Sequence, residues 1–185
     1  RLGVHSAVAQ YTLPLVLPKM TARFPDIKFN LVHDLSRRVT EAVISSHLDV
    51  AIAVNPVAHN DLIIKEICKD IVTLWKPKNI SNEHVLMYDD NLLQAQDIIR
   101  KLENRKMIFN NHMHSGSLET IAQLLKAGVG YAILPKRVVH AFQISGVEKV
   151  EDAPIFQDRI CLVYKQEFRK TKRGQIFIEN MSGSF

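Results

Sequence analysis

The sequence predicts an α/β fold, in which helices pack against sheets of buried strands. The clearest sign is Ser115–Pro135, SGSLETIAQLLKAGVGYAILP, which reads as a helix, a glycine turn and a strand. A second sign lies in residues 37–54, where a helical segment runs directly into the apolar stretch Leu48–Val54. A helix followed closely by a buried strand is the repeating unit of α/β proteins. With 46% hydrophobic residues in a chain of 185, the protein can also bury a sizeable core.

The first of these stretches carries the signals of both of its elements. Its apolar residues recur at the spacing of one helical face: Leu118, Ile121, Ala122 and Leu125. Ser115–Ser117 supplies capping side chains at the helix start, and Gly128 is placed for a left-handed C-cap. Glu119 in the first turn and Lys126 in the last turn both suit the helix dipole. Tyr131–Leu134 is then a short buried strand.

The N-terminal elements alternate in the same way. We predict a strand, a turn, a helix and a second strand, over Arg1–His5, Ser6–Gln10, Leu13–Phe24 and Ile27–His33. Thr12 would cap this helix and Pro14 suits its first turn, whereas Pro18 removes a backbone donor. Ser36 is expected to cap the next helix, residues 37–47.

The second half of the chain continues the alternation. Strands are predicted over Ile63–Ile67, Ile71–Trp75, His84–Tyr88, Met107–Asn110 and Arg159–Tyr164. Helices are predicted over residues 92–102, 136–141 and 175–180. Two polar joins that contain proline, Lys76–Asn79 and Ala153–Gln157, are candidate crossovers between two lobes. The last strand would then return to the first lobe and pair near Val72–Trp75.

Charge, cysteines and motifs exclude several classes of protein. The net charge of +5 is spread along the chain, apart from Arg169–Arg173, and is typical of a solvated surface. Cys68 and Cys161 lie in apolar runs, without disulfide or metal spacing, as in a reducing compartment. No run of residues reaches the length of a membrane span, and no signal peptide is visible. GxSxG, HExxH, P-loop and GxGxxG motifs are all absent, so we predict no enzyme and no cofactor.

Three segments together resemble the C-terminal effector-binding domain of LysR-type transcriptional regulators. They are the strand–Ser–Leu-Pro–helix–Phe-Pro–strand order of residues 1–33, the run Leu48–Ile52, and Leu125–Pro135. The resemblance covers essentially the whole chain. It implies an α/β fold of two Rossmann-like lobes joined by two crossover strands, the type II periplasmic-binding-protein-like fold. The regulatory lobes would be residues 1–76 plus 158–185 and residues 77–157.

The same resemblance implies the partners. It suggests a small-molecule effector in the cleft between the lobes, and a cytoplasmic regulator that meets DNA only through an N-terminal helix-turn-helix absent from this fragment. It also implies an antiparallel homodimer, with a tetramer left open for the full-length protein. In that dimer Leu13–Phe24 and Ile27–His33 would face Leu118–Ala127 of the partner. The alternative is a secreted solute-binding protein of the same fold that serves a transporter, and the sequence upstream of Arg1 would distinguish the two.

Polar and aromatic residues at strand ends are the candidate ligand contacts. They are Ser6, Ser36, Asn55, Tyr88, Asp89, Asn110, His112 and His114. Capping or turn formation is the alternative role of Ser6, Ser36, Asn55 and Asp89. The two histidines have no third ligand at metal spacing, so no metal site is predicted. Hydroxyls and free helix N–H groups at such ends attract anions, so the effector is expected to be a small carboxylate.

Overall fold

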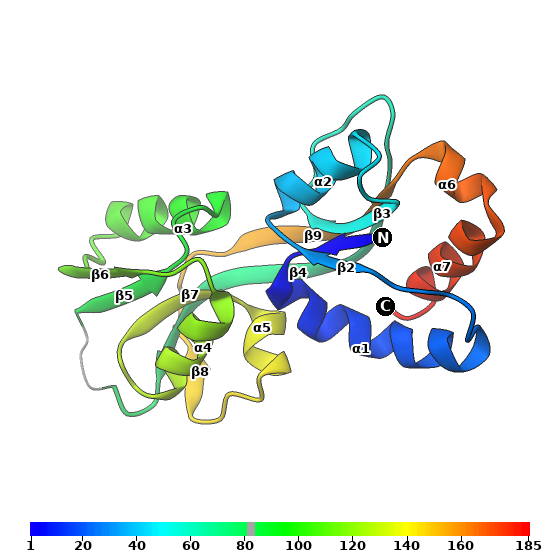
Figure 1. Ribbon diagram of the computed structural model, residues 1–185. Coiled ribbons are helices and arrows are strands. Elements are labelled where there is room, and N and C mark those ends of the chain that lie inside the picture. Colours follow the sequence, from blue (N-terminus) through cyan, green and yellow to red (C-terminus); the bar gives the residue numbers. More distant parts are fainter. Residues whose placement is uncertain (81–83) are drawn as a thin grey trace. The chain divides into compact units, whose positions relative to one another are not determined.

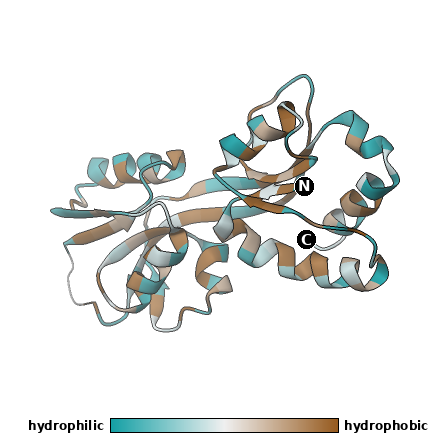
Figure 2. Cartoon of the chain, in the orientation of Figure 1, coloured by the Kyte–Doolittle hydropathy of each residue, from teal (hydrophilic) through white to brown (hydrophobic). Residues whose placement is uncertain are grey.

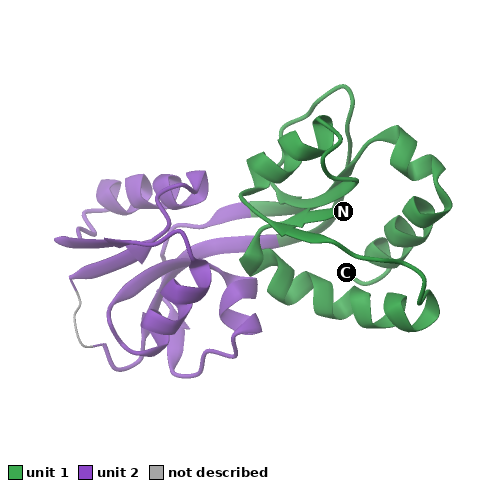
Figure 3. Cartoon of the chain, viewed as in Figure 1, with its two compact units in different colours: residues 1–69, 158–185 green, residues 70–157 purple. Residues whose placement is uncertain are grey.

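The computed structural model describes residues 1–80 and 84–185, and it divides into two compact units (Figures 1 and 3). Unit 1 comprises residues 1–69 and 158–185, and unit 2 comprises residues 70–157. Two strands, β4 (Ile63–Pro77) and β9 (Phe156–Tyr164), contribute residues to both units. The chain therefore passes between the units twice, each time within a strand.

β4 differs from the two separate strands predicted over this stretch. It runs unbroken from Ile63 to Pro77, so the units change at residue 69 rather than after residue 76. The polar residue Asp70 does not interrupt the strand, although it is only 6% exposed. Its carboxylate accepts hydrogen bonds from the backbone N–H groups of Ile71 and Arg137, at 2.8 and 3.2 Å. These bonds satisfy the acid within the strand, as a buried polar group requires.

The sheet of unit 1 has a parallel centre. β1 (Leu2–Val4) pairs in parallel with both β2 (Leu31–His33) and β3 (Val50–Val54). β9 pairs antiparallel with β3, from Ile160 opposite Val54 to Tyr164 opposite Val50. The return of residues 159–164 to the first lobe is thus confirmed. β9 is also a hydrogen-bonded neighbour of β4, the strand that contains Val72–Trp75, near which it was predicted to pair. Val72–Trp75 themselves are in register with Pro135–Ala132 of β7.

Helices cover both faces of this sheet, because its strands are apolar on both sides. One face packs on α1 (Ser6–Arg23) and α7 (Lys172–Ser182), and the other packs on α2 (Ser36–Ile44). Alternate residues of β3 separate the two layers, since Val50 and Ile52 face α1 while Ala51 and Ala53 face α2. Figure 2 shows the corresponding concentration of apolar residues along the strands.

α1 begins earlier than predicted. Ser6–Gln10 is helical rather than a turn, and Thr12 lies inside the helix, fully buried, with its hydroxyl donating to the Val8 carbonyl at 2.8 Å. Pro14 and Pro18 remain within the helix. Each proline lacks the N–H that would bond the carbonyl four residues earlier, on Gln10 or Pro14. All three residues are exposed, so water can bind those carbonyls and the helix continues.

The segments next to α1 and α7 also differ from prediction. Only Leu31–His33 of the expected strand Ile27–His33 joins the sheet, as β2, while Ile27 and Phe29 pack half-buried on the core without a ladder. The last helix starts at Lys172 rather than 175, and a short helix, α6 (Gln166–Lys170), precedes it. The basic run predicted as solvated surface spans the corner between these two helices.

Unit 2 repeats the architecture with other connections. β5 (Val85–Tyr88) pairs in parallel with β6 (Asn111–His114) and with β7 (Tyr131–Pro135), and β7 pairs antiparallel with β4. β8 (Val147–Lys149) pairs antiparallel with β4. α3 (Leu93–Asn104) packs on the face that carries Leu86, Tyr88 and Ile133. α4 (Leu118–Lys126) and α5 (Lys136–Ala141) lie against β7.

The helix–glycine–strand stretch has the predicted form. Ser117 caps α4 by accepting the Thr120 N–H at 3.1 Å, and Gly128 adopts a φ of 82°. Gly130 serves a different need from Gly128. A Cβ at Gly130 would lie 2.6 Å from the Val85 carbonyl oxygen, so only glycine lets β7 approach β5 at this level.

β6 falls on the polar residues rather than on the apolar ones. The strand predicted over Met107–Asn110 lies over Asn111–His114, all four of which are exposed. β6 ends the strand order of unit 2, and Figure 2 shows it mostly in hydrophilic colours. An edge strand that is solvated on both faces does not need apolar side chains. The prediction from hydrophobic residues therefore placed this strand four residues too early.

Candidate functional site

The carboxyl ends of three parallel strands meet at one edge of unit 1. Val4 of β1 is in register with His33 of β2 and with Ile52 of β3. α1 starts at Ser6 just beyond this edge, and α2 starts at Ser36. We call this region the carboxyl edge of unit 1. The structure thus brings Ser6, Ser36 and the residue after β3 to one side of one sheet, where open α/β folds bind their ligands.

The start of α1 leaves donors free. His5, not Ser6, is the N-cap, and its Nδ1 accepts the Ala7 N–H at 3.3 Å. The capping role considered for Ser6 is therefore wrong. Ser6 is half-buried, and within residues 1–80 and 84–185 its hydroxyl has no hydrogen-bond partner. In the same described ranges, the backbone N–H groups of Ser6 and Val8 have no acceptor either, as is usual for the first turn of a helix.

Ser36 joins α2 to β3 instead of capping the helix. The N-cap of α2 is Leu35, which has no capping side chain. The Ser36 hydroxyl accepts the Val54 N–H at 2.9 Å and so satisfies the last backbone donor of β3. The capping role predicted for Ser36 is therefore wrong, and its oxygen is already engaged. The first-turn N–H groups of α2 still point away from the helix, available for an anion.

Asn55 holds the turn after β3. Its φ of 49° lies in the left-handed region, which asparagine tolerates better than most residues. Its Nδ2 donates to Asp158 Oδ1 at 2.7 Å, and its Oδ1 accepts the Arg159 N–H at 2.9 Å. The turn role considered for this residue is thus observed. The Asn55 side-chain amide has a second N–H donor, which could bind a ligand in this geometry.

Tyr88, His112 and His114 form an aromatic cluster in unit 2. The Tyr88 ring lies edge-on to both imidazoles, with centroids 5.7 and 4.6 Å away. His112 Nε2 lies 3.0 Å from the Phe109 carbonyl, which can only accept, so this nitrogen carries the proton. Nδ1 of His112 then accepts the Tyr88 hydroxyl at 3.1 Å. Burial raises the pKa of the Tyr88 phenol, which keeps it a donor.

Asp89 lies directly after β5 and is 1% exposed. Its Oδ1 accepts the backbone N–H of Asn91 at 2.9 Å, which makes a local turn. The expected cap of the following helix is not observed, because Leu92 is the N-cap of α3. In the described part of the chain Asp89 Oδ2 is buried without a hydrogen-bond partner. An unpaired acceptor of this kind would accept a donor from a ligand or from water.

Asn110 is separated from the other unit 2 candidates. It immediately precedes β6, whose first residue Asn111 pairs with Val85 at the start of β5. His114 pairs with Tyr88 at the far end of the same two strands. Four residues of strand span roughly 10–13 Å. Within unit 2 the structure therefore groups Tyr88, Asp89 and His114 at the carboxyl end, with Asn110 at the amino end.

Sequence reasoning missed three polar residues that the structure places with the candidates. His5 caps α1, His33 ends β2 with its Nδ1 3.2 Å from the Val4 carbonyl, and Asp158 binds Asn55. The two histidines lie at the ends of predicted strands. The criterion that selected Ser6, a polar residue at a strand end, could therefore have selected them too. Asp158 could not be found in this way, because its partner lies 103 positions away.

The described residues contain neither a cluster of metal-ligating side chains nor a helix suited to a membrane. In residues 1–80 and 84–185 no group of three or more His, Cys, Asp or Glu side chains is arranged to hold a metal ion. Among the helices of these same residues, none combines the length and apolar character needed to cross a bilayer. Both cysteines are free thiols, with Cys161 buried and Cys68 half-buried.

The chain consists of two α/β units linked through two strands, and helix starts and polar residues lie at the sheet edges. These features define a ligand-binding domain of the type II periplasmic-binding-protein-like fold. The chain belongs to the LysR substrate binding domain family, whose model matches residues 1–184. The family predicted from the sequence is thereby confirmed.

Curated relatives agree with this assignment. The HTH-type transcriptional regulator YofA of Bacillus subtilis is 24% identical over 189 residues, which cover 98% of this chain and 66% of the relative. The HTH-type transcriptional regulator SoxR of Arthrobacter sp. is 21% identical over 180 residues, 93% of this chain and 62% of the relative. The chain thus spans less than two thirds of these relatives. Because they are transcriptional regulators, the alternative of a transporter's solute-binding protein is not favoured.

Solved structures share the fold. Reduced OxyR from N. meningitidis superposes with a TM-score of 0.77 at 17% identity, covering 100% of this chain and 94% of that one. The reduced regulatory domain of OxyR2 from Vibrio vulnificus gives 0.71 at 17% identity, with coverage of 98% and 91%. At such low identity these matches establish the architecture alone.

Proposed function

We propose that the carboxyl edge of unit 1 binds a small anionic effector, and that the domain thereby regulates transcription. The observation that carries this proposal is the convergence of two helix starts, at Ser6 and Ser36, on one edge of a parallel sheet. Free N–H groups and the positive end of the helix dipole favour a negative charge there. The Ser6 hydroxyl adds a donor that no other described group uses. A carboxylate fits such donors without a fixed cationic partner.

Tyr88, Asp89, His112 and His114 of unit 2 are the proposed additional contacts. The His114 imidazole can donate to an anion, and the unpaired Asp89 Oδ2 suits an amine or hydroxyl. The Tyr88 hydroxyl and both His112 nitrogens are engaged with one another and with the Phe109 carbonyl, so these two residues would contact a ligand through their rings. An effector between the lobes, as the family resemblance implies, remains a prediction. Binding would change the regulator only by its difference in affinity between two states of the domain. In a cytoplasmic full-length protein, a helix-turn-helix would convert that change into altered DNA binding.

Calorimetry with a panel of small carboxylates tests the site. For any carboxylate that binds, Ser6→Ala should weaken the affinity by about threefold to tenfold, the scale of one lost hydrogen bond. Ser45→Ala is the matched control, because Ser45 lies at the other end of α2 and its hydroxyl bonds within that helix. Equal affinity of the wild type and Ser6→Ala would place the ligand elsewhere.

We also propose that the chain forms a homodimer through exposed apolar side chains. In unit 1 these lie on α1 and β2: Leu15, Leu31 and Val32, each 39–46% exposed. In unit 2 they lie on α3 and around β6: Leu93, Met107, Ile108 and Met113. The apolar residues of α4 are instead buried or half-buried, which favours α3 and β6 over the Leu118–Ala127 helix as the contact surface. An isologous dimer uses two such patches in each copy.

A further inference from the structure

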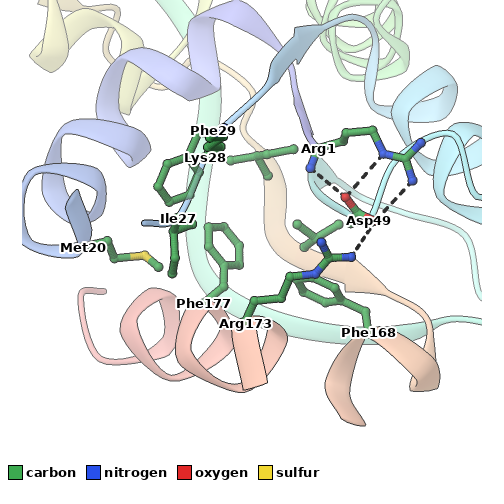
Figure 4. A pocket seen from close by; sticks show the side chains of 11 residues that line it. Arg1, Met20, Ile27, Lys28, Phe29, Asp49, Phe168, Arg173 and Phe177 are labelled. Carbon is green, nitrogen blue, oxygen red and sulfur yellow. Dashed lines mark hydrogen bonds and ion pairs between the residues drawn. The ribbon is translucent and has the colours of Figure 1, made fainter. Parts of the chain in front are cut away.

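Unit 1 contains a hollow that is distinct from its carboxyl edge (Figure 4). The hollow lies where the strands begin, at Leu2 of β1 and Val50 of β3, whereas Ser6 and Asn55 follow the ends of the same strands. Three to five residues of strand correspond to roughly 10–15 Å. A molecule in this hollow would therefore not touch the proposed effector contacts at Ser6 and Asn55.

The floor of the hollow is apolar and aromatic. Leu2, Met20, Val50 and Phe177 line it and are each no more than 4% exposed. The Phe177 ring stands 6.5 Å from that of Phe29, tilted by 49°, so the two rings form an angled wall. The hollow is shallow, with a cavity volume of about 60 Å³, and it opens to solvent. A ring or branched chain bound here would therefore lie across the open mouth, against the Phe29 side of the wall, rather than inside an enclosed cavity.

The rim is charged, with an excess of cations. Arg1, Lys28 and Arg173 line it together with a single acid, Asp49. Asp49 is already engaged by Arg1, whose guanidinium donates to both carboxylate oxygens at 3.2 and 3.4 Å. Arg173 Nη2 lies 3.6 Å from Asp49, too far for a hydrogen bond, and its side chain is 66% exposed. Lys28 makes no ion pair with any described residue. Two cationic groups therefore retain unused donors beside an apolar floor.

We propose that this hollow binds a small amphipathic carboxylate, as a second ligand site of the domain. The carboxylate would be held by Arg173 and Lys28, and the ring or branched chain would lie against Phe29 and Phe177. Figure 4 shows Arg173 beside Asp49, which lies between Arg173 and Arg1. The charged rim explains why an anion would bind, and the buried floor explains why acetate alone would not suffice.

Titration of the isotope-labelled chain with phenylacetate, followed by amide chemical shifts, tests this site. The expected result is saturable shifts at Arg173, Phe177 and Phe29 below about 10 mM, a range that detects a millimolar Kd. Phenylacetamide lacks the charge and acetate lacks the ring, so each should bind at least about tenfold more weakly. No shift at these residues, or shifts centred on Ser6 and Ser36, would overturn the proposal.

Two variants assign the charge. Arg173→Gln should weaken phenylacetate binding by about fivefold, the scale of an exposed ion pair. Arg100→Gln is the matched control, because Arg100 lies on α3 of unit 2 with a side chain 72% exposed and also pairs with one aspartate. In Arg173→Gln, any phenylacetate-induced shifts at Ser6 and Ser36 should be unchanged, which separates this site from the proposed effector site. If Arg173→Gln and Arg100→Gln bind phenylacetate alike, Arg173 does not hold the carboxylate and the assignment is wrong.

Discussion

Asn55 Nδ2 donates a hydrogen bond of 2.7 Å to Asp158 Oδ1, across 103 positions of sequence. The bond joins the end of β3 to the part of β9 at which the chain re-enters unit 1. Asp158 is 3% exposed, so its carboxylate depends on such partners in place of water. The turn at Asn55 therefore stabilises the sheet of unit 1 as well as shaping its carboxyl edge.

Asn55→Ala should lower the free energy of unfolding by about 2–3 kcal/mol. The variant loses the hydrogen bond to a buried carboxylate and places alanine at a φ of 49°. Asn55→Gly loses the same bond without the backbone strain, so it should be about 1 kcal/mol more stable than Asn55→Ala. Urea denaturation measures both. Wild-type stability in Asn55→Ala would show that the bond contributes nothing.

Ser36→Ala and Ser6→Ala should separate stability from ligand binding. Ser36→Ala removes the acceptor of the Val54 N–H and should destabilise the chain by about 1–2 kcal/mol. Ser6→Ala removes a hydroxyl without a partner among the described residues, so its stability should stay within about 0.5 kcal/mol of the wild type. Thermal and urea unfolding provide the comparison. The reverse order of stability would contradict the geometry of both serines.

Gly130→Ala should destabilise unit 2 by about 1–3 kcal/mol, the scale of overpacking. The added Cβ would lie 2.6 Å from the Val85 carbonyl and 2.7 Å from Val85 Cβ, which forces β7 and β5 apart. Gly116→Ala is the matched control, because a Cβ there meets nothing within 4 Å. Hydrogen exchange of the β5 and β7 amides would locate the effect. Equal protection in the two variants would refute the close-approach role.

Acid should remove a stabilising contribution of Asp49. Burial acts to raise the pKa of Asp49, but hydrogen bonds and positive charge from Arg1 outweigh it and hold the pKa at about 2. This is below the ordinary value of 3.8, so the native state favours the ionised form. The contribution, at most about 2 kcal/mol, is present above about pH 4 and is lost as the pH falls toward 2.

Asp49→Asn should therefore be less stable than the wild type at pH 6 and nearly equal to it near pH 2. Asp61→Asn, whose parent side chain is 67% exposed, controls for the loss of a surface carboxylate. Urea unfolding across this pH range gives the difference. A gap between wild type and Asp49→Asn that stays constant down to pH 2 would show that the acid is not coupled to its partners.

Charge on the proposed dimer patches should dissociate the protein. Val32→Asp in β2 and Ile108→Asp beside β6 would each place a carboxylate in an apolar contact. Both should sediment as monomers at roughly tens of micromolar, where the wild type is expected to be dimeric. Val57→Asp, at a position 82% exposed in unit 1, should remain dimeric. A monomeric wild type at that concentration would contradict the dimer itself.

Elements whose signals are local were predicted well. α4 and β7 lie within a residue of their predicted bounds, because cap, apolar stripe, left-handed glycine and strand all follow one another in sequence. The sequence also predicted the α/β class and the family, since these depend on the order of such signals along the chain. Strand ends led to Ser6, Ser36 and Asn55, which do share one edge of one sheet.

Tertiary structure decided the points at which a residue's partner is distant. Asp70 stays in β4 because the start of α5 supplies an N–H, and Pro14 stays in α1 because its face is turned to solvent. Ser36 binds β3 instead of its own helix. Likewise β6 is polar because it forms an edge. Local sequence encodes propensities of less than about 1 kcal/mol per residue, and burial or one satisfied hydrogen bond outweighs them.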